Sequence, residues 1–231
     1  MRRVFVDWIE GDRAGVGGAR AHHLARVVRL RPGERVEASD FRRAFEAVAE
    51  AVEPKEVLFR LGTELPPEPP EPAIELHLAI VKYARWEWAL EKATELGVAT
   101  VVPLAAERSD EGLVRAAAKR VERWRAIAEE AAQQSRRLAP PELTEPLNVA
   151  QALARPAESR WLVDFGGAPI GGLGGEAAGR HVVAVGPEGG WSDRERAAFA
   201  SAGARAVSLG PRVLRTETAA VVGVAVRLAS E

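Results

Sequence analysis

The residues best suited to chemistry lie just ahead of an apolar run near the carboxyl end of the chain. The run begins at Ala219, and directly before it residues 210–218 read GPRVLRTET. This stretch combines backbone-shaping residues with two arginines, two threonines and a glutamate. Such side chains can stabilise developing charge, accept a proton or supply hydrogen bonds. Polar chemistry of this density at the start of a buried helix indicates a ligand site.

A second loop of unusual composition follows another predicted strand. Residues 186–190 read GPEGG, so three glycines surround a proline and Glu188. Glycine lets the backbone take a positive φ and approach a ligand closely. In open α/β sheets, ligands gather at the carboxyl ends of the strands, where both loops are expected. We therefore favour a shared ligand site over two tight turns without a ligand.

Several other kinds of site are excluded. Cysteine is absent, which rules out disulfides, thiolate metal sites and cysteine nucleophiles. Residues 172–177, GLGGEA, match a dinucleotide fingerprint but lead into a strand instead of a helix. We expect the glycine-rich residues 166–179 to form a flexible loop. No phosphate loop and no GxSxG motif occurs. The spacing of the four histidines fits no metal site, so none is expected.

The elements that must position the two loops alternate between strand and helix. Apolar runs predict strands at residues 74–81, 100–104, 161–165, 181–186 and 204–210. They are short and rich in valine, as in a parallel sheet covered on both faces. Helices are expected at residues 84–97, 113–136 and 191–203, and from Thr216 onward. This alternation predicts an α/β domain.

Three of these helices carry further signals. The helix at 84–97 should bury Trp86, Ala89, Leu90 and Ala93 and end at Gly97. The helix at 191–203 should begin with a capping box of Ser192 and Glu195 and close at Gly203. In the long helix at 113–136, one apolar stripe is expected to comprise Val114, Ala117, Val121, Trp124 and Ala128.

A proline-rich spacer divides the chain. Residues 64–73 hold five prolines, which favour an extended conformation and predict a linker between domain 1–63 and domain 74–231. The first domain reads as a small β-rich barrel, with a strand at 4–9, one short helix at 21–29 and a turn leading into a strand at 31–38. Residues 44–52 fit helical and strand spacing equally well.

Charge is unevenly distributed. The net charge is -1, and of the 32 basic residues only Lys55, Lys82, Lys92 and Lys119 are lysines. Residues 13–43 hold eight arginines against three acidic residues, which indicates a docking surface for a polyanion. No run approaches the length of a membrane span and no signal peptide is apparent, so we expect a cytoplasmic protein.

The two loop sequences, GPEGGWS and LGPRVLRTETAA, resemble the signature of the RsmE family. Its members are 16S ribosomal RNA uridine N3-methyltransferases of the SPOUT superfamily. HHLARVVRLRPGERVEASD resembles the PUA-like barrel of that family, and KYARWEWALEKATELGV resembles the first helix of its catalytic domain. This chain departs from the pattern at Tyr83 and Ala84, where a glycine and an acidic residue are common.

The resemblance implies a deep trefoil knot, S-adenosylmethionine as the methyl donor, and a homodimer. It also implies which residues surround the cofactor: Gly186, Glu188, Gly190, Leu209, Gly210, Leu214, Arg215, Thr218 and Ala219. For methyl transfer to a uracil nitrogen, Arg215 is the candidate for stabilising negative charge on the uracil oxygens. Glu217 would accept the proton or hold Arg215 in place, and Glu188 would balance the sulfonium.

RNA would dock on the arginine-rich N-terminal domain. The candidates for phosphate contact are Arg26, Arg29, Arg31, Arg42 and Arg43. The expected partner is 16S ribosomal RNA or the small ribosomal subunit, with neither a metal nor a membrane. Two alternatives stay open: a SPOUT methyltransferase with another RNA target, and a ribosome-assembly factor that binds RNA without catalysis.

Overall fold

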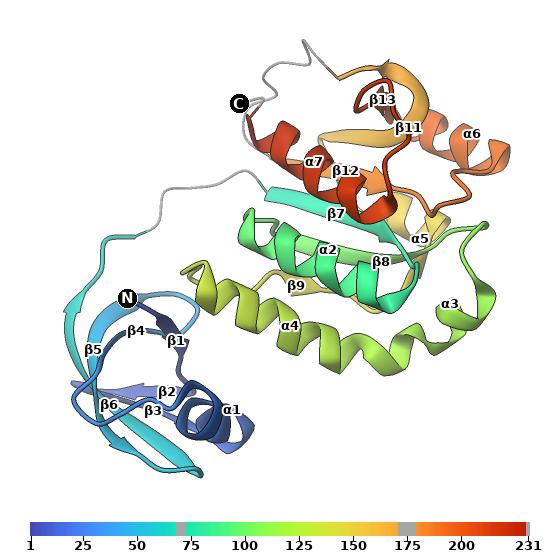
Figure 1. Ribbon diagram of the computed structural model, residues 1–231. Helices are drawn as coiled ribbons and strands as arrows, with labels where there is room; N and C mark the ends of the chain where they lie inside the picture. The colour runs from blue at the N-terminus through green and yellow to red at the C-terminus, as the bar shows by residue number, and fades with distance from the viewer. Residues whose placement is uncertain (68–72, 171–178, 230–231) are drawn as a thin grey trace. The chain divides into compact units, whose positions relative to one another are not determined.

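A computed structural model describes residues 1–67, 73–170 and 179–229 of the 231-residue chain (Figure 1). The chain divides into two compact units. The first comprises Met1–Pro70 and Ala132–Pro140, and the second comprises Glu71–Ala131 and Pro141–Glu231. The proline-rich residues 68–72 lie outside the described residues, as do residues 171–178 of the predicted glycine-rich loop.

The first unit is built on a sheet that, within the described residues, has six strands in the order β1-β4-β5-β6-β3-β2. Only β1 and β4 pair in parallel. The strands are β1 Arg3–Phe5, β2 Trp8–Glu10, β3 Arg13–Gly17, β4 Arg35–Ser39, β5 Ala44–Val52 and β6 Glu56–Glu64. Figure 1 shows these strands curving around a common interior. The core of this unit includes Val16, Val36, Val57 and Phe59. The predicted β-rich barrel is confirmed.

Two N-terminal elements differ from the prediction. The strand expected at residues 4–9 is two strands, because the chain changes its partner strand between them: Val6 N–H donates to Ser39 O of β4 and Asp7 N–H donates to Gly15 O of β3. The helix expected at 21–29 begins earlier, as α1 Gly18–His23, and continues as a π-helical turn over Leu24–Val28. It stops at Arg29, whose φ of 58° is left-handed.

Residues 44–52, ambiguous in sequence, form strand β5. Ala47 and Ala49 face the core while Val48 is exposed, which is strand alternation. The register against β6 shifts between Phe45 and Ala47 and again between Ala49 and Ala51. Because each shift interrupts the two-residue period, the sequence pattern alone could not separate strand from helix.

The second unit is a parallel sheet with helices on both faces, as predicted. Its main path runs β10-β8-β7-β12-β11-β13, and β9 pairs with β8. All described pairings in this sheet are parallel. The strands are β7 Ala73–Ala79, β8 Thr100–Ala105, β9 Glu142–Leu143, β10 Leu147–Asn148, β11 Ser159–Pro169, β12 Arg180–Val185 and β13 Arg205–Ser208.

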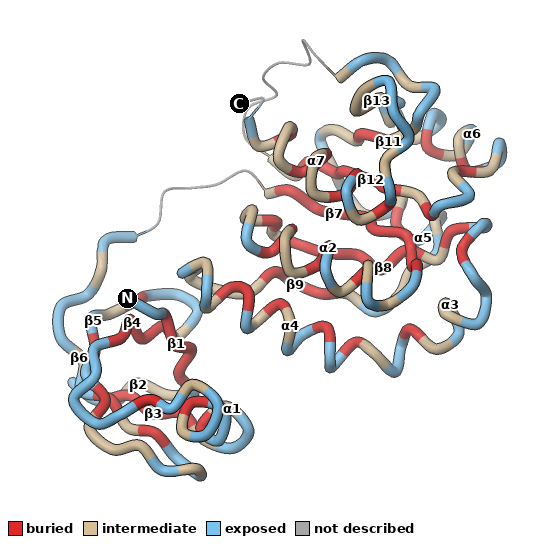
Figure 2. Tube along the Cα trace, viewed as in Figure 1, coloured by how far each residue is buried: buried red, intermediate tan, exposed pale blue. Residues whose placement is uncertain are grey.

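Neighbouring residues of each central strand enter different cores. Leu78 and Val183 pack with helices α2 Tyr83–Glu95, α4 Val121–Gln134 and α7 Thr216–Ala229. Ala79 and Val182 pack with α5 Val149–Leu153 and α6 Asp193–Ser201. The central strands are buried almost throughout (Figure 2). Burial on both faces explains why these strands are continuous apolar runs in the sequence.

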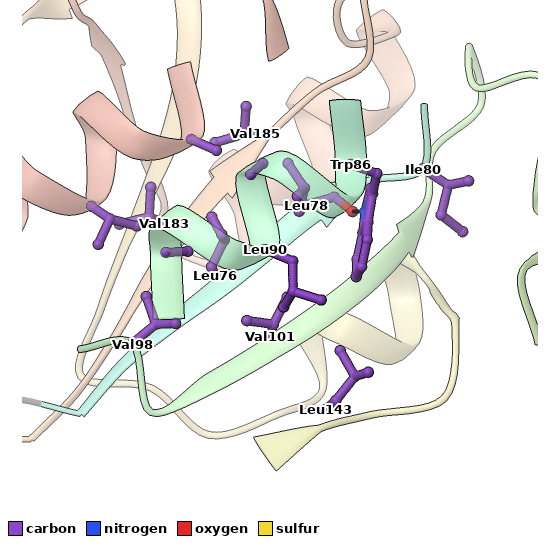
Figure 3. Packing of buried hydrophobic residues seen from close by; sticks show 14 of the residues in the cluster. Leu76, Leu78, Ile80, Trp86, Leu90, Val98, Val101, Leu143, Val183 and Val185 are labelled. Atoms are coloured by element: carbon purple, nitrogen blue, oxygen red, sulfur yellow. Dashed lines mark hydrogen bonds between the residues drawn. The ribbon is translucent and has the colours of Figure 1, made fainter. Parts of the chain in front are cut away.

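Helix α2 confirms the predicted pattern of burial. Trp86, Ala89, Leu90 and Ala93 are buried, and Gly97 caps the end with a φ of 98°. Figure 3 shows Trp86 and Leu90 against the sheet residues of β7 and β8. The Trp86 ring stacks on Trp124 of α4 with centroids 3.9 Å apart. Helix α2 also packs against α7, at whose start the candidate site lies.

The single helix expected at residues 113–136 is wrong in one respect. The segment forms α3 Glu111–Ala117, a 3-10 turn at Ala118–Arg120 and then α4. Ala117 and Val121, which flank this turn, are both buried. The capping box of Ser192 and Glu195 in α6, the closing Gly203 and the start of α7 at Thr216 are confirmed.

Candidate functional site

The two loops singled out in the sequence meet at one edge of the parallel sheet. Residues 186–190 follow β12 and residues 209–215 follow β13. Both strands pair in parallel with β11, one on each side, so their carboxyl ends lie at the same edge. The Thr216 hydroxyl donates to the Gly186 carbonyl at 3.0 Å and ties the start of α7 to the first loop.

An open cavity lies between these loops. Its volume is about 140 Å³, and it opens to solvent. Its lining combines backbone-rich turns with apolar side chains and a few charged ones: Val163, Asp164, Phe165, Val185, Gly186, Pro187, Glu188, Gly190, Trp191, Ser208, Leu209, Gly210, Arg212, Val213, Leu214, Thr216 and Ala219.

Backbone shape in both loops depends on glycine. Gly190 has a φ of 68° and Gly210 a φ of 133°, values that other residues rarely adopt. At Gly186 a Cβ atom would lie only 3.0 Å from the ring of Trp191. That ring is buried, and its Nε1–H donates to the Val163 carbonyl at 3.0 Å. At these three glycines the loops therefore present backbone to the cavity.

Most of the residues predicted to hold a cofactor line the cavity. Those that do are Gly186, Glu188, Gly190, Leu209, Gly210, Leu214 and Ala219. Arg215 and Thr218 are exposed and lie outside this lining, as does Glu217. The Arg215 carbonyl accepts the first hydrogen bond of α7, from Ala219 N–H at 2.9 Å.

Arg85, on the first turn of α2, was missed by the sequence analysis. Its Nη1 donates to Glu188 Oε1 at 2.8 Å, and its Nε lies 3.9 Å from Glu217 Oε1. Glu217 Oε2 is buried and has no hydrogen-bond partner among the described residues. Glu217 thus pairs with Arg85, and the described structure shows no ion pair between Glu217 and Arg215. Only the packing of α2 against α7 brings these groups together, and no spacing in the sequence reveals it.

Asp164 was missed as well. It lines the cavity from β11, and its carboxylate accepts a hydrogen bond from Arg196 Nε at 2.7 Å. Arg196 belongs to α6 and also pairs with Asp193 at 3.2 Å. Two cavity carboxylates, Asp164 and Glu188, are therefore each paired with a guanidinium, which holds them in fixed positions.

The five arginines predicted to bind RNA are all exposed on the first unit. Arg43 lies 3.7 Å from Asp40 and 3.9 Å from Glu64. Burial acts to raise the pKa of Asp40, but hydrogen bonds from the backbone of Arg43 and Arg42 outweigh it and lower the pKa. Across the described ranges, no carboxylate lies within ion-pairing distance of Arg26, Arg29, Arg31 or Arg42. Unpaired surface guanidinium groups suit phosphate contacts.

Residues 1–67, 73–170 and 179–229 contain no group of three or more residues arranged to hold a metal ion. Among the helices of these same ranges, none has the length and apolarity to span a bilayer.

Comparisons with known proteins add a family context. The model of the RNA methyltransferase domain matches residues 67–227, and that of the RNA methyltransferase PUA domain matches residues 16–61. A relative from Aquifex aeolicus is 38% identical over 168 residues, covering 72% of this chain and 71% of that protein. One from Mycobacterium bovis is 35% identical over 229 residues, covering 92% and 84%. Both are named ribosomal RNA small subunit methyltransferase E.

A solved structure is similar over nearly its whole length. It is a ribosomal RNA small subunit methyltransferase E from Neisseria gonorrhoeae bound to S-adenosyl methionine. The TM-score is 0.85 at 29% identity, with 97% of this chain and 95% of that chain covered.

Proposed function

This chain belongs to the RNA methyltransferase domain family, and from that membership we propose that it transfers a methyl group from S-adenosylmethionine to N3 of a uridine in 16S ribosomal RNA. The observation that carries the proposal is the cavity at the carboxyl ends of β12 and β13, formed by the two loops that also carry the family signature. The similar structure from Neisseria gonorrhoeae, named ribosomal RNA small subunit methyltransferase E, is bound to S-adenosyl methionine.

The residues present fit this cofactor. The apolar lining from Val185, Leu209 and Leu214 suits an adenine ring, whose edge can bond to loop backbone groups. At Gly210 no atom lies within 4 Å of where a Cβ would be, so the backbone there is open to a ligand. The small Ala219 leaves room at the start of α7. We propose Arg215 and Thr218 as further cofactor contacts, at the rim of the cavity.

Bound S-adenosylmethionine supplies an electrophilic methyl group on a sulfonium. The residues of this chain have to orient the acceptor base, exclude water and deal with the proton on uracil N3. Arg215, exposed beside the cavity, would stabilise negative charge on the uracil oxygens. Glu217 has two open roles: proton acceptor, or positioning residue. Its pairing with Arg85 and its place outside the cavity lining favour positioning.

RNA docking is assigned to the first domain. We propose domain limits of 1–63 and 74–231, joined by a linker at 64–73. The exposed side chains of Arg26, Arg29, Arg31, Arg42 and Arg43 would contact phosphates without reading sequence. A uridine in folded RNA must be splayed out before its N3 can reach the cavity.

Three further properties complete the proposal. The resemblance to the SPOUT superfamily implies a trefoil knot and a homodimer. The small ribosomal subunit as partner implies a cytoplasmic location.

The test is a transfer assay with purified protein, labelled S-adenosylmethionine and small subunits that lack the modification. We expect label in the RNA. Label in transfer RNA but not in small subunits would mean that the substrate is transfer RNA instead of 16S ribosomal RNA. No transfer to any RNA, with cofactor binding intact, would favour a non-catalytic assembly factor and contradict the proposal.

A further inference from the structure

One segment of β11 leaves its ladder at the mouth of the cavity. Because Val207 aligns with both Val163 and Ala168, the four residues 164–167 between them are unpaired with β13. At Gly167 a Cβ atom would lie 2.5 Å from Val207 N, so the chain crosses close over the backbone of β13. Such irregularities commonly re-aim a side chain next to a functional site. The residue displaced here is Phe165.

Phe165 is displayed to solvent instead of being packed. It is 60% exposed, and Val213 of the opposite loop is 81% exposed. Both line the cavity, whereas Trp88 of α2, the other large apolar side chain exposed in the described part of this unit, does not. Exposed apolar groups gathered at a cavity mouth mark a binding surface. We call Phe165 and Val213 the apolar lip.

The charges beside the apolar lip point to a nucleic acid. Arg212 lines the cavity between Gly210 and Val213, and Arg215 follows two residues after Val213. Both side chains are exposed, and no carboxylate of the described chain lies within ion-pairing distance of either. An aromatic face flanked by free guanidinium groups is the combination with which proteins hold unstacked bases and the phosphates beside them.

We infer that the apolar lip is the site for the acceptor base, with the ring of Phe165 stacking on the flipped pyrimidine and Val213 contacting its edge. This inference rests on the proposed function. The deeper wall, with Val185, Leu209 and Leu214, takes the apolar part of the donor, so the acceptor must enter from the open side. Phe165 and Val213 lie at that side, where a base can meet the donor while its phosphates face Arg212 and Arg215.

The experiment compares Phe165→Ala, Phe165→Leu and Phe165→Trp with Trp88→Ala, a matched removal of an exposed aromatic side chain away from the cavity. For each variant, kcat/KM is measured with small ribosomal subunits, and the Kd for S-adenosylhomocysteine is measured by calorimetry. Removing one base–aromatic stack should lower kcat/KM by about 5- to 150-fold in Phe165→Ala. Phe165→Leu should be similarly impaired, Phe165→Trp should stay near wild type, and Trp88→Ala should be unaffected.

Cofactor affinity and oligomeric state separate this site from other uses of the apolar lip. The inference requires an unchanged Kd for S-adenosylhomocysteine and unchanged assembly in Phe165→Ala. A weakened Kd would make Phe165 part of the cofactor wall. A change in sedimentation would make the apolar lip a contact between copies of the chain. Either result, or full activity in Phe165→Ala, would overturn the inference.

A second readout does not depend on turnover, so failure of the proposed function stays distinguishable. An oligonucleotide containing 4-thiouridine is photocrosslinked to the wild-type protein in the presence of S-adenosylhomocysteine, and the crosslinked peptides are identified by mass spectrometry. Crosslinks in the peptide that carries Phe165 support the base site even if no methyl transfer is seen. Crosslinks confined to the first unit would overturn it even if the protein methylates RNA.

Discussion

Arg85 joins two carboxylates, that of Glu188, which lines the cavity, and that of Glu217, which lies outside its lining. It donates to Glu188 of the 186–190 loop at 2.8 Å and lies 3.9 Å from Glu217 at the start of α7. Without the guanidinium, Glu217 would lose the cation beside its Oε1, and Glu188 would be free to turn away. A single side chain of α2 therefore sets the position of both carboxylates.

Arg85→Ala should lower kcat by about tenfold, since charged hydrogen bonds contribute about 1.5–3 kcal/mol and this one is part-exposed. Arg85→Lys keeps the charge but cannot contact both carboxylates equally, so it should recover only part of the loss. Steady-state kinetics with separate kcat and KM values is the measurement. Arg123→Ala is the control. Arg123 belongs to α4 and pairs on the surface with Glu87 of α2, the helix that carries Arg85. Equal losses in both variants would mean that α2 is merely destabilised.

Gly210 tests whether the loop backbone shapes the cofactor site. Its φ of 133° is strained for any other residue, although a Cβ would meet no neighbour. Gly210→Ala should therefore cost about 1–3 kcal/mol of strain and weaken binding of S-adenosylhomocysteine by about tenfold or more in calorimetry. Gly33→Ala in the first unit, with a φ of 87° and equally open space, provides a matched control. It should lower thermal stability while leaving cofactor affinity unchanged.

At the scale of elements, a buried ion cluster ties together three parts of the second unit. Glu75 of β7 accepts hydrogen bonds from Arg155, which follows α5, at 2.7 and 3.0 Å, and from Arg180 of β12 at 3.2 Å. His77 Nε2 lies 2.7 Å from the same carboxylate. Burial acts to raise the pKa of Glu75, but the hydrogen bonds from His77 and Arg155 outweigh it and lower the pKa to about 2.

This shift predicts a pH-dependent stability. Because the pKa of Glu75 is lower in the folded state, its stabilisation is complete above the ordinary value of 4.5 and is lost as the pH falls toward 2. The contribution is about 3 kcal/mol. Denaturant unfolding at pH 7 and pH 3 should show a smaller pH dependence in Glu75→Gln than in wild type. Glu122→Gln, on an exposed surface pair, should behave like wild type. If the free energy of unfolding of Glu75→Gln depended on pH as strongly as that of wild type, this account would be contradicted.

How far the sequence predicts these elements depends on whether local pattern or tertiary contact decides them. The start of α6 is fixed by local capping residues, so Ser192 and Glu195 predicted this helix from the sequence alone. The displacement of Phe165 comes from β11 meeting Val207 twice, which no local pattern encodes, so residues 161–165 read as an ordinary buried strand. Likewise, Gly186 and Gly210 predicted the two loops from local composition. The contact of Arg85 with those loops depends on how α2 and α7 pack, which the sequence pattern does not show.

At the scale of the whole molecule, docking and chemistry are assigned to different units. Charge reversal by Arg29→Glu with Arg31→Glu should raise KM for small subunits and leave the Kd for S-adenosylhomocysteine unchanged. Loss of two phosphate contacts should also reduce the slope of log affinity against log salt by about 1.5. Lys55→Glu, an exposed charge reversal outside the arginine cluster, is the control. If the double variant bound RNA as tightly as wild type, the first unit would not be the docking surface.

The measurement that tests the central claim most directly is nucleoside mass spectrometry of 16S ribosomal RNA after incubation of small subunits with this protein and labelled S-adenosylmethionine. The cavity and the family membership predict a single labelled product, N3-methyluridine, which Gly210→Ala should reduce. Label on a ribose oxygen, or on any other base, would contradict the assignment of the reaction.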